Sequence, residues 1–205
     1  LGFSIVDANI EGEDKNGLKV NDMAESYHHS SFAIKVQATD KVSVGLLYDQ
    51  PYGADSNYPV ADSSVFTTQL NTPTQGTTAK VDTHNITALL GYQFNKNWKI
   101  YGGPVWQSVA ADIKLRGAAY GDLNYNIDVP TKDAYGWVAG FAYQIPEIAL
   151  QAAITYRSEI EHNAHAQETT RIPMYASDEI VQAITPQSVN IDLQTGVAKN
   201  TLVFA

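Results

Sequence analysis

The chain repeats one pattern from end to end: apolar and polar residues alternate with a period of two over long segments. The clearest segments are 31–39, 42–49, 135–143, 148–157 and 188–197. A period of two places each set of side chains on its own face of a β-strand. No segment of comparable length repeats apolar residues at helical spacing. The sequence therefore predicts an all-β fold.

The connections between the predicted strands alternate between tight and long. Tight turns with Asn, Asp or Pro fall at 39–41, 95–97, 146–147 and 199–200. Long polar stretches, predicted as outer loops, fall at about 12–29, 54–80, 117–132 and 166–185. The strands are predicted near 2–11, 30–39, 41–53, 81–94, 98–116, 133–145, 148–164 and 187–198, with a ninth beginning at Thr201.

Short turns on one side and long loops on the other are typical of an outer-membrane β-barrel. A sheet in hydrocarbon must close on itself, because lipid cannot pair with the amides of an open edge. The inner face of such a barrel tolerates polar residues, and aromatic residues collect at the two interfaces. The sequence predicts Lys35, Arg157, Glu159 and Asp192 on the inner face. It predicts an aromatic girdle at Tyr92, Phe94, Trp98 and Tyr143.

Composition narrows the class of protein further. A formal net charge of −9 argues against a nucleic-acid partner, which needs clustered cations. The absence of cysteine excludes a disulfide framework, a thiolate metal site and a cysteine nucleophile. No window approaches the ~18 apolar residues of a membrane-spanning helix.

The strand count bears on closure of the barrel. Bacterial single-chain barrels have an even number of strands, whereas this sequence supplies eight and the beginning of a ninth. We therefore expect residues 1–205 to be one partial domain of a larger transmembrane antiparallel barrel.

Four stretches resemble the FadL/TodX family of outer-membrane transporters. Residues 42–53, VSVGLLYDQPYG, resemble an early wall strand that ends in an aromatic-glycine pair, and residues 91–98, GYQFNKNW, resemble a hairpin of the family. Residues 153–160, AITYRSEI, are similar to its ALTYRSE strand, and residues 186–196 are similar to the strand after the next loop. The matches keep the same order along nearly the whole chain.

The resemblance implies a barrel of about fourteen strands with an N-terminal plug in the outer membrane of a Gram-negative cell. It implies passive uptake of long-chain fatty acids or other hydrophobic compounds by a monomer surrounded by outer-membrane lipid and lipopolysaccharide. The plug and the C-terminal strands are not among these residues. No cofactor is expected.

Uptake of an amphiphile needs an apolar landing surface, a partner for the polar head and a way out through the wall. Apolar residues in the predicted loops are candidates for the landing surface, and they equally suit a lid in which the loops pack on each other. The candidates are Tyr58, Phe66, Leu70, Ile172, Met174 and Tyr175.

Cations are the candidates for the polar head, because guanidinium groups bind carboxylates with two hydrogen bonds. Arg157, Lys114 and Arg116 are the candidates. The alternative for Arg157 is an ion pair with neighbouring Glu159 or Glu161.

Residues 50–54 interrupt a regular strand and are the candidate exit. Pro cannot donate to the sheet and Gly weakens it, so both mark bulges, edges or strand ends. The resemblance implies a kink that opens the barrel sideways, whereas the simpler alternative is a strand that ends in a loop. The residues are Gln50, Pro51, Tyr52, Gly53 and Ala54.

Histidine pairs at 28–29 and at 162 and 165 suggest a metal site, but the second pair falls on opposite faces of a strand. We therefore expect solvated loop histidines and no metal. No arrangement of Ser, His and acid predicts an enzyme. The alternatives to a hydrophobic-compound transporter are a general diffusion porin and a structural or adhesive barrel.

Overall fold

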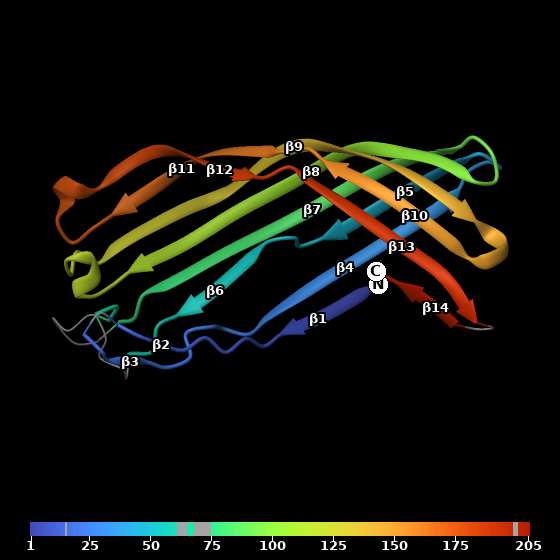
Figure 1. The fold of residues 1–205 in the computed structure, drawn as a ribbon. Coiled ribbons are helices and arrows are strands. Elements are labelled where there is room, and N and C mark those ends of the chain that lie inside the picture. Colours follow the sequence, from blue (N-terminus) through green and yellow to red (C-terminus); the bar gives the residue numbers. More distant parts are fainter. Residues whose placement is uncertain (15, 61–64, 68–74, 199–200) are drawn as a thin grey trace.

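The computed structural model describes residues 1–14, 16–60, 65–67, 75–198 and 201–205. Its main element is a 12-stranded antiparallel sheet that curls into a half-barrel (Figure 1). Nine strands follow one another across it: β1 (Gly2–Val6), β4 (Tyr27–Gln37), β5 (Val42–Asp49), β7 (Thr78–Gln93), β8 (Trp98–Leu115), β9 (Tyr125–Ile145), β10 (Leu150–Arg157), β13 (Ser188–Ala198) and β14 (Thr201–Phe204).

The remaining elements branch from this path. Strand β6 (Gly53–Asn57) pairs with β7, and β11 (Ile160–Thr169) pairs with β9 and with β12 (Ser177–Thr185). A small hairpin joins β2 (Gly12–Glu13) to β3 (Lys19–Val20). Short 3₁₀ turns are η2 (Ala118–Tyr120), η3 (Pro146–Ile148) and η4 (Pro173–Tyr175). The all-β partial barrel predicted from the alternation is confirmed.

The long connections gather at one end of the sheet and the tight hairpins at the other (Figure 1). The predicted turn at 199–200 lies outside the described residues, although the flanking Ala198 and Thr201 are paired. Among the described residues, no helix has the length and apolar character needed to cross a membrane.

Several predicted boundaries were wrong. The strand predicted at 41–53 is divided into β5 and β6, and that at 148–164 into β10 and β11. The predicted loop 117–132 contains the start of β9, and the predicted loop 166–185 contains most of a β-hairpin. These strands extend beyond the apolar part of the sheet, where neither face has to be apolar, so the alternation does not reveal them.

One face of the sheet is a continuous apolar surface. Cross-strand neighbours share a face, and one row across four strands consists of Val42, Tyr92, Ile100 and Phe141. The row through Val44, Leu90 and Gly102 lies next to it. Leu90 is 60% exposed and Ile191 is 61% exposed, although both are in the interior of long strands. This exposed apolar face is the one that the sequence predicts to lie against lipid.

Aromatic residues border the apolar face at both ends, and we call these borders the outer and inner girdles. The inner girdle, near the tight turns, confirms the predicted grouping: the Trp98 ring lies 4.4 Å from that of Tyr143, and Tyr92 lies 5.2 Å from Phe94. The outer girdle comprises Phe32, Tyr48, Trp106, Tyr135, Trp137 and Tyr156.

The spacing of the girdles matches a bilayer. Strand β8 carries Trp98 in one girdle and Trp106 in the other. At ~3.3 Å per residue and a tilt of ~40°, this segment spans about 20 Å along the barrel axis, close to the ~25 Å apolar band of outer-membrane barrels.

The opposite face is lined by small and polar residues and is most buried at its centre. Thr83, Asn85, Thr87 and Gln107 are each at most 3% exposed. A small apolar cluster of Val105, Val138 and Ile160 lies among them. Ile160 belongs to β11, so the hairpin after β10 packs against the inner face of β8 and β9. We call this face the lumen face.

Candidate functional site

The predicted kink coincides with a break in the sheet. Strands β5 and β6 both pair with β7, but the last pair of β5 is Asp49 with Asn85 and the first pair of β6 is Gly53 with Asp82. Three residues of one strand, 50–52, therefore face two of the other, 83–84. This is a bulge of one extra residue, and Pro51 at its centre has no N–H to donate.

The bulge is held by side chains in place of main-chain pairs. The Tyr52 N–H donates to Thr83 Oγ1 at 3.0 Å, and the Thr83 hydroxyl donates in turn to the Tyr52 carbonyl. Asn85 Nδ2 donates to Asp49 Oδ1 at 2.7 Å. Thr83 is 3% exposed. The chain at the break is thus tied to β7, and its pairing with β7 resumes at Gly53 in β6.

The break leaves an opening between β4 and β6. The Ser30 N–H donates to Gln50 Oε1 at 3.1 Å, and His29 Nε2–H donates to the Gln50 carbonyl at 2.7 Å. The next main-chain contact across the gap is Glu25 N–H to the Asp55 carbonyl at 3.0 Å. The cavity between these contacts measures about 570 Å³, and we call it the window. It is lined by residues 26–29, 50–55 and 80–83.

The window adjoins the lumen face. A second cavity, of about 70 Å³, shares Pro51 and Tyr52 with the window and is also lined by Arg157 and Gln107. Pro51 and Tyr52 therefore form the partition between the two cavities. The window lies just beyond Phe32 and Tyr48, which are paired in the outer girdle, so it lies at the level of the outer girdle.

Arg157 points toward the lumen, as the alternation predicts. It pairs with the buried Val138, and its Nη1 donates to Thr87 Oγ1 at 3.4 Å. None of the ion pairs found within the described part of the chain includes Arg157. Glu161 instead accepts a hydrogen bond from Gln182, and Glu159 is exposed in the break between β10 and β11. The alternative of an Arg157–glutamate pair is therefore not observed.

Lys114 lies on the other face, which corrects its inclusion among the inward cations. Lys80 and Leu90 are separated by an even number of residues on β7, so both lie on the outward, apolar face. Lys80 pairs with Asp112 on β8, so Asp112 and Lys114 lie on that face too. Lys114 Nζ is 3.1 Å from Asp112 Oδ1, and both side chains are about half exposed. The register between β7 and β8 is unbroken along β8, so Lys114 has the parity of Ile100 and Trp106, and its charge alone did not place it in the lumen.

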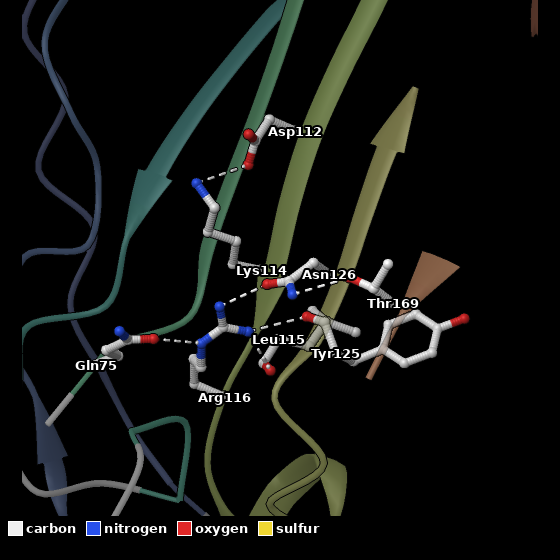
Figure 2. A network of polar contacts seen from close by, with 8 residues as sticks. All are labelled: Gln75, Asp112, Lys114, Leu115, Arg116, Tyr125, Asn126 and Thr169. Carbon is white, nitrogen blue, oxygen red and sulfur yellow. Dashed lines mark hydrogen bonds and ion pairs between the residues drawn. The ribbon is translucent and has the colours of Figure 1, made fainter. Parts of the chain in front are cut away.

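Arg116 is buried at 6% exposure and its guanidinium is enclosed by acceptors (Figure 2). Nε donates to Gln75 Oε1 at 3.0 Å, and Nη2 donates to Asn126 Oδ1 at 2.6 Å. Nη1 donates to the Leu115 and Tyr125 carbonyls, both at 3.0 Å. Burial lowers the pKa of Arg116, while Asp112 acts in the opposite direction. This geometry favours a structural role that fixes the outer connections over a role in binding the head of a ligand.

We expect Arg116→Met to destabilise the intact protein by about 2–4 kcal/mol, because the substitution leaves several buried acceptors unpaired. The measurement is the free energy of unfolding in denaturant. Lys114→Met is the matched control, because an exposed ion pair contributes at most ~1 kcal/mol. Equal effects of the two substitutions would contradict the structural role of Arg116.

The predicted landing residues form two groups. The ring of Phe66 lies 4.8 Å from that of Tyr58 and 6.2 Å from that of Tyr120 on η2, so these rings pack on each other. Ile172, Met174 and Tyr175 lie at the tip of the β11–β12 hairpin, with Met174 78% exposed. The Arg171 N–H donates to the Leu123 carbonyl, which attaches this tip to the connection that also carries Tyr120. Leu70 lies outside the described residues.

The histidines differ from the sequence-based expectation. His28 and His29 line the window. His162 is not solvated but 2% exposed, with Nε2 2.9 Å from Gln107 Oε1 and Nδ1 3.1 Å from the Lys132 carbonyl. The residues that the structure describes contain no group of three His, Asp or Glu side chains suited to hold a metal ion.

Three features were not predicted from the sequence. Thr83 holds the bulge, Gln50 bonds to β4, and His162 is buried against Gln107. The only local signal is polarity within a predicted strand, which many lumen-facing positions share. Their roles depend on partners 20 to 55 residues away.

The fold resembles those of two solved proteins. A FadL homologue of Pseudomonas aeruginosa matches with a TM-score of 0.66 and 12% identity, over 91% of this chain and 48% of the homologue. The CymD monoaromatic hydrocarbon channel matches with a TM-score of 0.53 and 11% identity, over 84% of this chain and 51% of the channel. No protein-family model and no curated protein matches the sequence. The chain thus has a FadL-like fold and spans about half the length of these two proteins.

Proposed function

We propose that this chain forms part of the wall of a Gram-negative outer-membrane channel, through which hydrophobic compounds, long-chain fatty acids among them, enter passively. The single observation that carries the proposal is the window between β4 and β6, next to the lumen face and at the outer edge of the apolar surface. The two structural neighbours are a FadL homologue and a hydrocarbon channel, which supports hydrophobic cargo.

The window suits a cargo that is soluble in lipid. An apolar molecule in the lumen gains free energy when it leaves sideways into the membrane, because apolar surface is removed from water. A gap in the pairing of the wall provides such a path without opening the rest of the sheet, since the amides around the gap are satisfied by Thr83 and Gln50. The loop residues Tyr58, Phe66, Leu70, Ile172, Met174 and Tyr175 are the proposed landing surface, with lipid and lipopolysaccharide around the barrel.

The lumen face argues against a general diffusion porin. Porins select by pore size and charge, whereas the central lumen residues here are Thr83, Thr87, Val105 and Val138. A channel that transfers apolar molecules needs no opposed rows of charge. The same neighbours are transport channels, which supports a function other than catalysis.

Uptake measurements test the proposal. Deleting the gene of the intact protein is expected to slow the uptake of oleate or of a monoaromatic hydrocarbon into whole cells, and to leave the uptake of a small sugar unchanged. Restoring the gene on a plasmid is the control. Equal loss of sugar uptake would identify a porin, and unchanged uptake of all three compounds would support a structural or adhesive barrel.

A further inference from the structure

Two lysines face the same cavity on the lumen face, at the end of the sheet near the tight turns. The cavity measures about 270 Å³ and is lined by Lys35 of β4 and Lys99 of β8 together with residues of β5 and β7 between them. Lys35 pairs with Gly45, which pairs in turn with Leu89. Leu89 packs against the lumen cluster, so the row that contains Lys35 belongs to the lumen face.

Small residues let Lys99 lean toward Lys35. A Cβ atom at Gly91 would lie 2.7 Å from Lys99 Cε and 2.6 Å from Ser43 Oγ, so the lysine side chain crosses the space above this glycine. Gly91 pairs with Ser43 of β5 on one side and with Tyr101 of β8 on the other. The Lys99 amine is thereby carried from its own strand over β7 toward β5.

Within the described residues, the two amines have no carboxylate partner. The ion pairs observed between residues of the described ranges include neither Lys35 nor Lys99. The cavity floor is partly apolar, with Leu47 and Leu89 beside the lysines. Two like charges beside an apolar surface repel each other and are poorly solvated, and an anion between them relieves both effects.

We infer that Lys35 and Lys99 form a binding site for the carboxylate head of an amphiphile, with its aliphatic chain against Leu47 and Leu89. This inference rests on the proposed function and deepens it, because it makes the tight-turn end of the lumen selective for acids over neutral hydrocarbons. A carboxylate has about four acceptor positions, and two amines and the Ser43 hydroxyl can donate to it. Tyr101 also lines the cavity, but its hydroxyl is already hydrogen-bonded to Thr155 Oγ1 at 2.6 Å, so it is not counted as a donor to the carboxylate.

The cavity composition selects the class of ligand. An inorganic anion would use the amines but not the leucines, and a neutral hydrocarbon would use the leucines but leave the amines unpaired. A ligand that uses both the amines and the leucines carries one negative charge at the end of an apolar chain. Its charge-assisted hydrogen bonds are about twice as strong as neutral ones.

Binding to the purified intact protein in detergent tests the inference. Dodecanoate, dodecanol and acetate are titrated against the wild type, Lys35→Gln/Lys99→Gln and Lys35→Arg/Lys99→Arg. We expect the glutamine variant to bind dodecanoate about 10- to 100-fold more weakly and to bind dodecanol as the wild type does. The arginine variant should bind dodecanoate to within about threefold of the wild type, because it keeps two cations that can donate charge-assisted hydrogen bonds to the carboxylate. Lys41→Gln, an exposed change in the neighbouring tight turn, is the matched control.

The outcomes separate this site from the proposed function. If the wild type binds dodecanoate and the glutamine variant binds it equally well, the lysine site is wrong while the transporter proposal stands. If the wild type binds neither dodecanoate nor dodecanol, the proposed function itself fails. Acetate binding as tight as dodecanoate binding would also overturn the inference, because it would make the site one for small anions.

Discussion

Deletion of Pro51 is expected to close the window and to lower the uptake of hydrophobic compounds by roughly tenfold or more. The bulge sets three residues against two, so removing one residue restores a one-to-one register between β7 and a continuous β5–β6 strand. Tyr52 then supplies the missing N–H to the sheet. The measurement is the initial rate of oleate or hydrocarbon uptake by cells that carry the variant at wild-type abundance in the outer membrane.

Pro51→Ala is the matched control for this deletion. It adds an N–H but keeps the extra residue, so the bulge and the window should persist and uptake should stay within about twofold of the wild type. The deletion variant should unfold at the same or higher denaturant concentration, because its strand is more regular. Wild-type uptake by the deletion variant, with correct assembly, would show that cargo does not leave through the window.

Leu90→Arg is expected to destabilise the protein in lipid vesicles by about 2–4 kcal/mol, the range for a cation at the middle of a lipid-facing barrel surface. Leu90 is exposed and pairs with Gly102, midway along β8 between the two girdle tryptophans. Unfolding by denaturant in vesicles gives the free energy. Assembly efficiency should fall in parallel, because insertion exposes the same residue to the bilayer.

Asp82→Arg is the control for depth. Asp82 lies on the same face of the same strand but beyond the outer girdle, and its side chain is 58% exposed. Its replacement should change the free energy of unfolding by no more than about 1 kcal/mol. If both substitutions have the same small effect, the apolar face does not contact hydrocarbon, and the outer-membrane location is wrong.

The lysine and arginine residues show how far single positions could be predicted. The inward direction of Lys35 and Arg157 follows from strand parity, and the structure confirms both. The same parity places Lys114 with Trp98 and Trp106 on the outward face, so its inward assignment, made from its charge, was wrong. Strand parity could not predict the burial of Arg116, because the acceptors of its guanidinium come from three separate segments.

The sequence by itself determined the β architecture, the apolar face, the inner girdle and the place of the break. These are properties of neighbouring residues: a period of two assigns faces, turn residues end strands, and Pro51 cannot donate to a sheet. Only the tertiary structure decided that the chain after the break returns to β7 and leaves a cavity beside β4, because Thr83 and Gln50 find their partners on other strands. It also brought Lys99 across Gly91 toward Lys35. Such contacts depend on the register between distant strands, which no local pattern specifies.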